Sequence, residues 1–219
     1  MPSAHDERPV EFMGGPLRRL FMRYPWHIST VVGLFVITGL RPCTRHVPDA
    51  PAVVAPMPHF ELETAEGTPY EPANLASTIW IAGFVCSSCK GGTAEVGPTL
   101  AELSTRIETH KKPLKVLAIV TDAPSTPSTW ITPQGLAPAV SLALSASPAT
   151  VASLKDQVAA AFGPDQPKPW DRIFIIDDQG KLRGAYALGE MGADEAYHRA
   201  QHVARDSKRS RKMNGVNPR

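Results

Sequence analysis

Two cysteines three residues apart, Cys86 and Cys89, are the residues of this chain best suited to chemistry. Before them lies an apolar run, Ile79 to Val85, rich in the aromatic and β-branched residues that buried strands prefer. After them come glycines and a predicted helix from Thr93 to His110. A thiol at such a strand-to-helix turn lies near unpaired backbone N–H groups and the positive end of the helix dipole, which lowers its pKa. Thiolates attack disulfides and bind soft metals, so Cys86 and Cys89 form the predicted site.

The charge and the cysteine count exclude several classes of protein. The formal net charge of +2 indicates no polyanionic partner, and we expect no nucleic acid. With only Cys43 in addition to the pair, the chain is not a disulfide-rich scaffold. A four-ligand zinc site would need a second pair at ligand spacing, and the candidate is His198 and His202. Charged residues surround that pair, so an exposed polar helix face is the favoured interpretation.

The amino terminus has the pattern of a signal anchor. Residues 24–40 contain no Asp, Glu, Lys or Arg, and their one histidine is taken as neutral. Aromatic residues stand at the start of this segment, and arginines precede it. That length is near the lower limit for a spanning helix. We therefore expect a cytoplasmic lead over residues 1–23, a single transmembrane segment over 24–40, and a location in the cell inner membrane with the rest of the chain facing the periplasm or cell exterior. A cleaved signal peptide, a lipoprotein attached through Cys43 and a buried core helix are the alternatives.

The remaining chain divides into a linker, a folded domain and a tail. Residues 41–58 are rich in proline and should form an extended linker. Residues 59–206 form the predicted domain. Residues 207–219 continue a basic stretch, starting at Arg205, and are predicted to be a disordered, solubilising tail, with contact to nucleic acid or phosphate as the alternative.

Strand and helix patterns alternate along the domain. Strands are expected over residues 59–64, 79–85, 114–121, 139–144, 172–177 and 181–188, and helices over 93–110, 148–162 and 193–205. Ser147 is the expected cap of the second helix, and the last two strands should form a hairpin. This order predicts an α/β domain of three layers with a mixed central sheet.

The order resembles the thioredoxin superfamily and, within it, the Sco/SenC group of copper-handling assembly proteins. The resemblance covers about residues 59–205, the anchor and the linker. Four segments carry it: Phe60-Glu61-Leu62 with Glu66-Gly67; Trp80-Ile81-Ala82-Gly83-Phe84; Val120-Thr121-Asp122 with Thr126-Pro127; and Phe174-Ile175-Ile176-Asp177-Asp178-Gln179-Gly180. It implies a thioredoxin-like fold.

The chain departs from the Sco pattern at the copper ligands. Aligned on Phe84, the first family cysteine falls on Cys89, but the second falls on Thr93 and the family histidine on Pro169. Cys86 gives the Cys-x-x-Cys spacing of thioredoxins instead, which implies side chains close enough for a Cys86–Cys89 disulfide. The Sco alignment makes Cys89 the attacking thiolate, the thioredoxin comparison makes it Cys86, and we favour Cys89.

Three functions follow from the resemblance. The first is a membrane-anchored Sco-like thiol–disulfide oxidoreductase that acts on cysteines of a copper-site protein or oxidase subunit and assists assembly of a copper-containing respiratory oxidase. The second is a chaperone that holds copper as Cu(I) on Cys86 and Cys89, with His59, Met191 or His198 as a candidate third ligand. The third is an interaction module that has lost its chemistry.

A few neighbouring residues have secondary roles in these hypotheses. Lys90 either adds positive charge near the thiols or is simply solvated, and the solvated interpretation is favoured. Asp177 is expected to cap the hairpin and not to act as an acid. Trp170 and Asp171 are expected to shape a groove for the partner.

Overall fold

The computed structural model describes residues 23, 26, 29–36, 49–86, 88–89, 92–122, 135–163 and 171–213, with the backbone alone at 92 and 93. The chain separates into two units, Met1–Pro48 and Asp49–Arg219. In the first unit, residues 29–36 are helical. Among the described residues, none of the helices combines the length and apolar character needed to cross a membrane. The predicted anchor over residues 24–40 lies only partly within these residues.

The second unit is built on a mixed sheet. Its described residues form eight strands in the order β1-β8-β7-β4-β5-β6-β2-β3. In chain order these are β1 (Ala55–Pro56), β2 (Leu62–Glu63), β3 (Pro69–Tyr70), β4 (Ile79–Val85), β5 (Leu114–Val120), β6 (Ser141–Ser145), β7 (Ile173–Ile176) and β8 (Lys181–Tyr186). The strands β4, β5 and β6 are parallel, whereas β7 pairs antiparallel with both β4 and β8. The predicted mixed central sheet is therefore confirmed.

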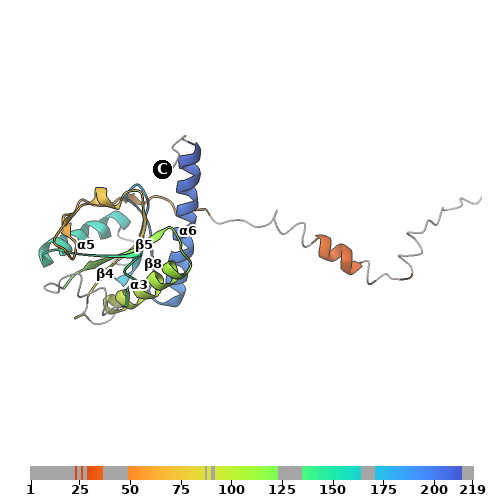
Figure 1. The fold of residues 1–219 in the computed structure, drawn as a ribbon, viewed down its shortest axis with the longest axis horizontal. Coiled ribbons are helices and arrows are strands. Elements are labelled where there is room, and N and C mark those ends of the chain that lie inside the picture. The colour runs from red at the N-terminus through yellow and green to blue at the C-terminus, as the bar shows by residue number, and fades with distance from the viewer. Residues whose placement is uncertain are drawn as a thin grey trace, which may run out of the picture. The chain divides into compact units, whose positions relative to one another are not determined.

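Helices cover both faces of this sheet (Figure 1). The α3 helix (Gly92–Thr109) and the α6 helix (Glu190–Met213) pack in one apolar cluster, and the α5 helix (Pro148–Phe162) packs in the other. A short 3-10 helix, η1 (Pro72–Leu75), adds Leu75 to the second cluster. Both clusters lie within residues 50–204, so the unit that begins at Asp49 contains its own complete core. The three-layer arrangement agrees with the prediction.

The central strand β4 has the predicted bounds, and it is buried on both faces. Ile79, Ile81 and Val85 join the cluster under α3 and α6, while Trp80 and Phe84 join the cluster under α5. A strand that has a neighbouring strand on each side and a helical layer on each face is buried all round, so its sequence is a continuous apolar run. This run is the pattern from which the strand was predicted.

The α5 helix also has its predicted start and end. The Ser147 hydroxyl accepts a hydrogen bond from the backbone N–H of Thr150, and Pro148 occupies the first turn. The helix stops at Phe162, where Gly163 adopts a positive φ of 85°. These are local signals, so the sequence alone determines this helix.

The main departures from the predicted boundaries are three. The α6 helix continues to Met213, so residues 207–213 of the predicted disordered tail are helical, and 214–219 lie outside the described residues. The predicted strand over residues 59–64 is reduced to β2, because β2 pairs with β6 at Glu63 alone. The folded unit begins at Asp49, within the predicted linker, since β1 pairs with β8.

Candidate functional site

The two cysteines form a disulfide in the turn between β4 and α3. Cys86 follows the last residue of β4, and Cys89 lies three residues later, with 5.5 Å between the two Cα atoms. The adjacent strand β5 holds this turn in place. The backbone N–H of Thr121 donates to the carbonyl oxygen of Val85 at 2.9 Å, and the N–H of Ser88 donates to Oδ2 of Asp122 at 2.9 Å. The turn is therefore tied to the carboxyl end of the parallel neighbour.

The two sulfurs differ in their access to solvent. Cys86 is only 8% exposed, at the end of a fully buried strand. Its sulfur lies 3.7 Å from the hydroxyl of Ser88. Cys89 is exposed. A disulfide with one accessible and one sheltered sulfur directs an incoming nucleophile to the accessible sulfur, here Cys89.

A pocket of about 310 Å³ opens beside the disulfide. Both cysteines, Ser88, Thr121 and Asp122 line it from the sheet side, and Pro148, Val151, Ala152 and Lys155 line it from α5. The pocket therefore lies between the turn that contains the two cysteines and α5, the helix on the face of the sheet opposite α3.

Lys155 is the charged residue that α5 brings to this pocket. Burial lowers the pKa of Lys155, and the carboxylates of Asp171 and Asp156 partly oppose that decrease. Its Nζ atom lies 5.7 Å from the centre of the Phe84 ring. A cation next to a cysteine pair favours the thiolate over the thiol. Lys155 is far from the cysteines in the sequence and was not predicted, whereas Lys90 was considered for this effect because it follows Cys89 directly.

A signal for Lys155 does exist in the sequence. It lies one helical turn after Val151, whose side chain is buried against the sheet, so the two residues share a face of the predicted helix. The sequence does not show that this face of the helix lies beside the end of β4, because that position depends on the tertiary fold.

The other proposed ligands are not brought to the pocket among the described residues. Met191 is 89% exposed in the first turn of α6. The ring of His59 lies 3.7 Å from Glu61, and His198 lies 3.5 Å from Asp194. Lys90, Pro169 and Trp170 lie outside the described residues, as does the side chain of Thr93.

The donors present do not make a complete metal site. Within the described part of the chain, no group of three His, Cys, Asp or Glu side chains could hold a metal ion. The two sulfurs are bonded to each other and would become ligands only after reduction. The His198–His202 pair has no third ligand in that part of the chain either. Desolvation lowers the pKa of His202, and the positive charge of Arg205 lowers it further.

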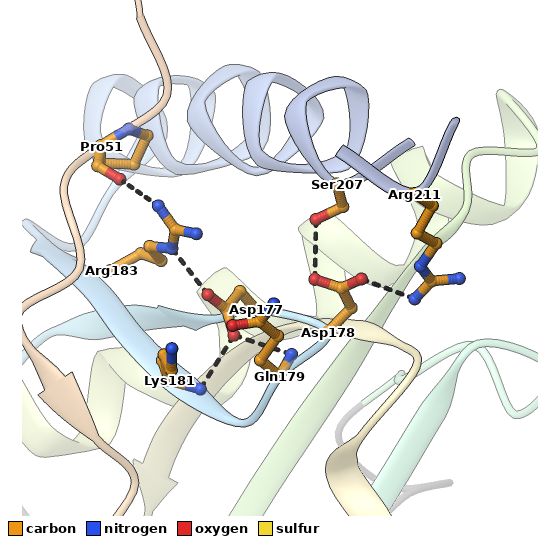
Figure 2. A network of polar contacts seen from close by, with 8 residues as sticks. All are labelled: Pro51, Asp177, Asp178, Gln179, Lys181, Arg183, Ser207 and Arg211. Atoms are coloured by element: carbon orange, nitrogen blue, oxygen red, sulfur yellow. Dashed lines mark hydrogen bonds and ion pairs between the residues drawn. The ribbon is translucent and has the colours of Figure 1, made fainter. Parts of the chain in front are cut away.

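Asp177 caps the hairpin between β7 and β8, as predicted. Its Oδ1 accepts hydrogen bonds from the N–H groups of Gln179 and Lys181, both at 2.9 Å (Figure 2). Its Oδ2 accepts from Nε of Arg183 at 2.7 Å, and the Asp177 side chain is fully buried. All of these partners are structural, so Asp177 has no role in the pocket.

Comparisons with known proteins give a fold but no sequence relative. No family model matches the chain, and no curated protein matches it. The solved structure of BsSco, a member of the Sco family of cytochrome c oxidase assembly proteins with a disulfide switch, aligns with a TM-score of 0.56 and 13% identity, covering 72% of this chain and 98% of that chain.

Two further structures extend the likeness. An SCO1/SenC family lipoprotein from Bacillus anthracis aligns with a TM-score of 0.52 and 15% identity, covering 68% of this chain and 95% of that chain. Copper-bound ScoI from Arabidopsis thaliana aligns with a TM-score of 0.50 and 13% identity over 68% and 98% of the two chains. The chain therefore shares the fold of these Sco structures, in agreement with the predicted fold.

Proposed function

We propose that this chain is a membrane-anchored, Sco-like thiol–disulfide exchange protein whose Cys86–Cys89 pair reacts with cysteines of a partner protein. The observation that carries the proposal is the disulfide itself, placed at the edge of a pocket on a fold shared with BsSco, a protein described as having a disulfide switch. The proposed partner is a copper-site protein or an oxidase subunit, and the process is assembly of a copper-containing respiratory oxidase.

The exchange proceeds in two balanced steps. A partner thiolate attacks the exposed sulfur of Cys89, the Cys86–Cys89 bond breaks, and Cys86 leaves as a thiolate. A second partner thiolate then attacks the partner's sulfur in the mixed disulfide and releases Cys89 as a thiolate. The partner gains a disulfide and loses two electrons, which reduce the pair. In the reverse direction the Cys89 thiolate attacks a partner disulfide and Cys86 resolves the intermediate.

Lys155 contributes to both directions. Lys155 lines the pocket together with both cysteines. Its positive charge would stabilise the negative charge that develops on the sulfurs. The pocket itself would receive the partner segment that carries the reacting cysteine.

The proposed anchor over residues 24–40 has support from the first unit. Leu34 and Phe35 are 67% and 79% exposed in the described helical residues. Large apolar side chains on the outside of a helix favour lipid over water. The folded unit would then face the periplasm or cell exterior, where disulfides persist.

Copper binding is the second candidate. Copper-bound ScoI shares this fold, and two thiolates suit Cu(I). In this chain Cys86 and Cys89 would hold the ion after reduction, and no third ligand accompanies them among the described residues.

A thiol count separates these functions. In a Cys43→Ser full-length background, the two remaining thiols are titrated across glutathione buffers of increasing oxidised fraction, with and without Cu(I). Exchange predicts reversible loss of both thiols, and Cys86→Ser should react with a disulfide reagent much faster than Cys89→Ser. Stoichiometric Cu(I) uptake by thiols that resist oxidation would favour the copper chaperone. Thiols inert in both assays would overturn both functions in favour of an interaction module.

A further inference from the structure

The last two turns of α6 are fixed to the domain through one carboxylate. The Ser207 hydroxyl donates to Oδ1 of Asp178 at 2.7 Å, and Nη2 of Arg211 pairs with Oδ2 at 2.5 Å (Figure 2). Asp178 lies in the turn after β7, and its side chain is only 11% exposed. Ser207 and Arg211 are four residues apart, so they mark the face of α6 that docks on the domain.

The opposite face of this helix end carries four cations. Arg205, Lys208, Arg209 and Lys212 are all exposed. Their spacing of three, four and seven residues places them in one row along the helix, which we call the basic stripe. In the described part of the chain, none of the four has an ion-pair partner, and Asp206 is the single acidic residue between them.

The basic stripe opposes helix formation. Like charges three and four residues apart repel each other along a helix. Favourable interaction with the helix dipole is confined to the last turn, so it accounts for Lys212 but not for Arg205. The contacts to Asp178 therefore hold a helix end that its own charges would loosen, and they keep the four cations in one row along the helix.

The stripe fits an extended anionic surface. At the rise of an α-helix its four residues span roughly 10 Å, longer than one bound phosphate needs. Met213, 70% exposed, follows directly after the stripe. Residues 205–213 contain no aromatic side chain for base stacking, and the net charge of +2 is small for a nucleic-acid-binding protein.

We propose that the basic stripe binds the anionic headgroups of a membrane surface. The inference goes beyond thiol exchange and does not use the cysteines, but it agrees with the proposed membrane anchor. Clustered Lys and Arg on a helix are attracted to anionic lipid, and each contributes several-fold to the partition coefficient. The contact would orient the folded unit against the bilayer.

The test uses the fragment 49–219, which contains the whole core and lacks the predicted anchor. Its sedimentation is measured with vesicles of phosphatidylcholine alone or mixed with phosphatidylglycerol. The K208Q/R209Q variant removes two stripe charges, and K111Q/K112Q removes two adjacent charges elsewhere as a matched control. We expect binding only to the anionic vesicles, weakened roughly thirtyfold by K208Q/R209Q. The K111Q/K112Q control should stay within about twofold of the unmodified fragment.

Several results would overturn the proposal. They are the absence of sedimentation with phosphatidylglycerol vesicles, an equal loss in the two variants, or tighter binding to polyglutamate or a single-stranded oligonucleotide than to vesicles. Circular dichroism of each variant checks that the fold is retained. A C86S/C89S fragment should bind vesicles like the unmodified fragment, so failure of thiol exchange and failure of lipid binding are read separately.

Discussion

At the scale of single residues, the surroundings of the two sulfurs differ more than their spacing indicates. Cys86 is buried at the end of β4, and Cys89 is exposed in the turn. The pocket adds Lys155 from α5. In the proposed exchange, Cys89 is therefore the cysteine that a partner would reach, and Lys155 is the cation that would stabilise the leaving thiolate.

Replacing Lys155 by methionine should raise the pKa of the reactive thiol. The change removes the cation of the pocket and leaves an unbranched apolar side chain in its place, so we expect an increase of roughly one pH unit. Thiolate absorbance of the reduced C43S protein, followed against pH, measures it. Because burial lowers the pKa of Lys155 itself, its influence should fade at a lower pH than that of an exposed lysine.

The matched control for this change is Lys111→Met, which removes an exposed cation that does not line the pocket. An unchanged thiol pKa in K155M, or an equal increase in K111M, would contradict the role given to Lys155.

The residues of the site were predictable to different degrees. Cys86 and Cys89 are recognised from their spacing and from the strand before them, which are local features. Lys155 lines the pocket because α5 packs on the face of the sheet opposite α3, and this placement depends on the tertiary fold. Lys90, which is next to Cys89 in the sequence, lies outside the described residues.

At the scale of elements, the close contact of β4 with α3 positions the disulfide. A Cβ atom added at Gly83 would lie 2.6 Å from Cγ1 of Val96, well inside ordinary contact distance. Gly83 therefore allows α3 to approach the strand directly before the turn that contains Cys86.

Gly83→Ala should destabilise the protein by about 1–3 kcal/mol, because the added methyl group overpacks the β4–α3 interface. Chemical denaturation measures the free energy of unfolding. Val96→Ala alone should also destabilise, by leaving a cavity, but the double variant G83A/V96A should be more stable than the sum of the two effects. Strict additivity would show that the two side chains do not compete for the same space.

Elements were predictable where their stabilising contacts are local. The cap at Ser147 is a contact within three residues, and the apolar run of β4 is a signal that can be read within the strand itself, so both elements have the predicted bounds. The end of α6 depends on Asp178, which is 29 residues from Ser207 and 33 from Arg211. Composition alone indicated disorder there, because a basic sequence does not reveal its distant partner.

At the scale of the whole molecule, a buried phenol limits stability in alkali. Tyr186 lies in β8 within the cluster that includes α6, and a Cβ atom on Gly184 would lie 2.8 Å from its hydroxyl oxygen. Burial is the main cause that raises the pKa of Tyr186 to about 12. The positive charge of Arg199 partly opposes this increase, and the negative charge of Glu195 adds to it. The folded state therefore favours the neutral phenol.

The stability that depends on this phenol should be complete below pH 10, where the tyrosine is neutral in both states. It should be lost as the pH rises from 10 towards 12, because only the unfolded state then releases the proton. The loss amounts to about 2–3 kcal/mol for a difference of two pH units. Urea unfolding of wild type and Tyr186→Phe tests this, since the variant should lack this component of the decrease. Parallel curves for the two proteins would refute it.

The amino-terminal boundary of the folded unit has a mechanical consequence. Arg183 bonds to both Asp177 and the carbonyl oxygen of Pro51, and β1 adds an antiparallel ladder to β8 at Ala55 and Pro56. Tension transmitted along the chain from before Asp49 would therefore act first on the Arg183 contacts and the β1–β8 ladder. The β1–β8 ladder and the Arg183 contacts would have to break before any strain arrived at the turn that contains Cys86 and Cys89.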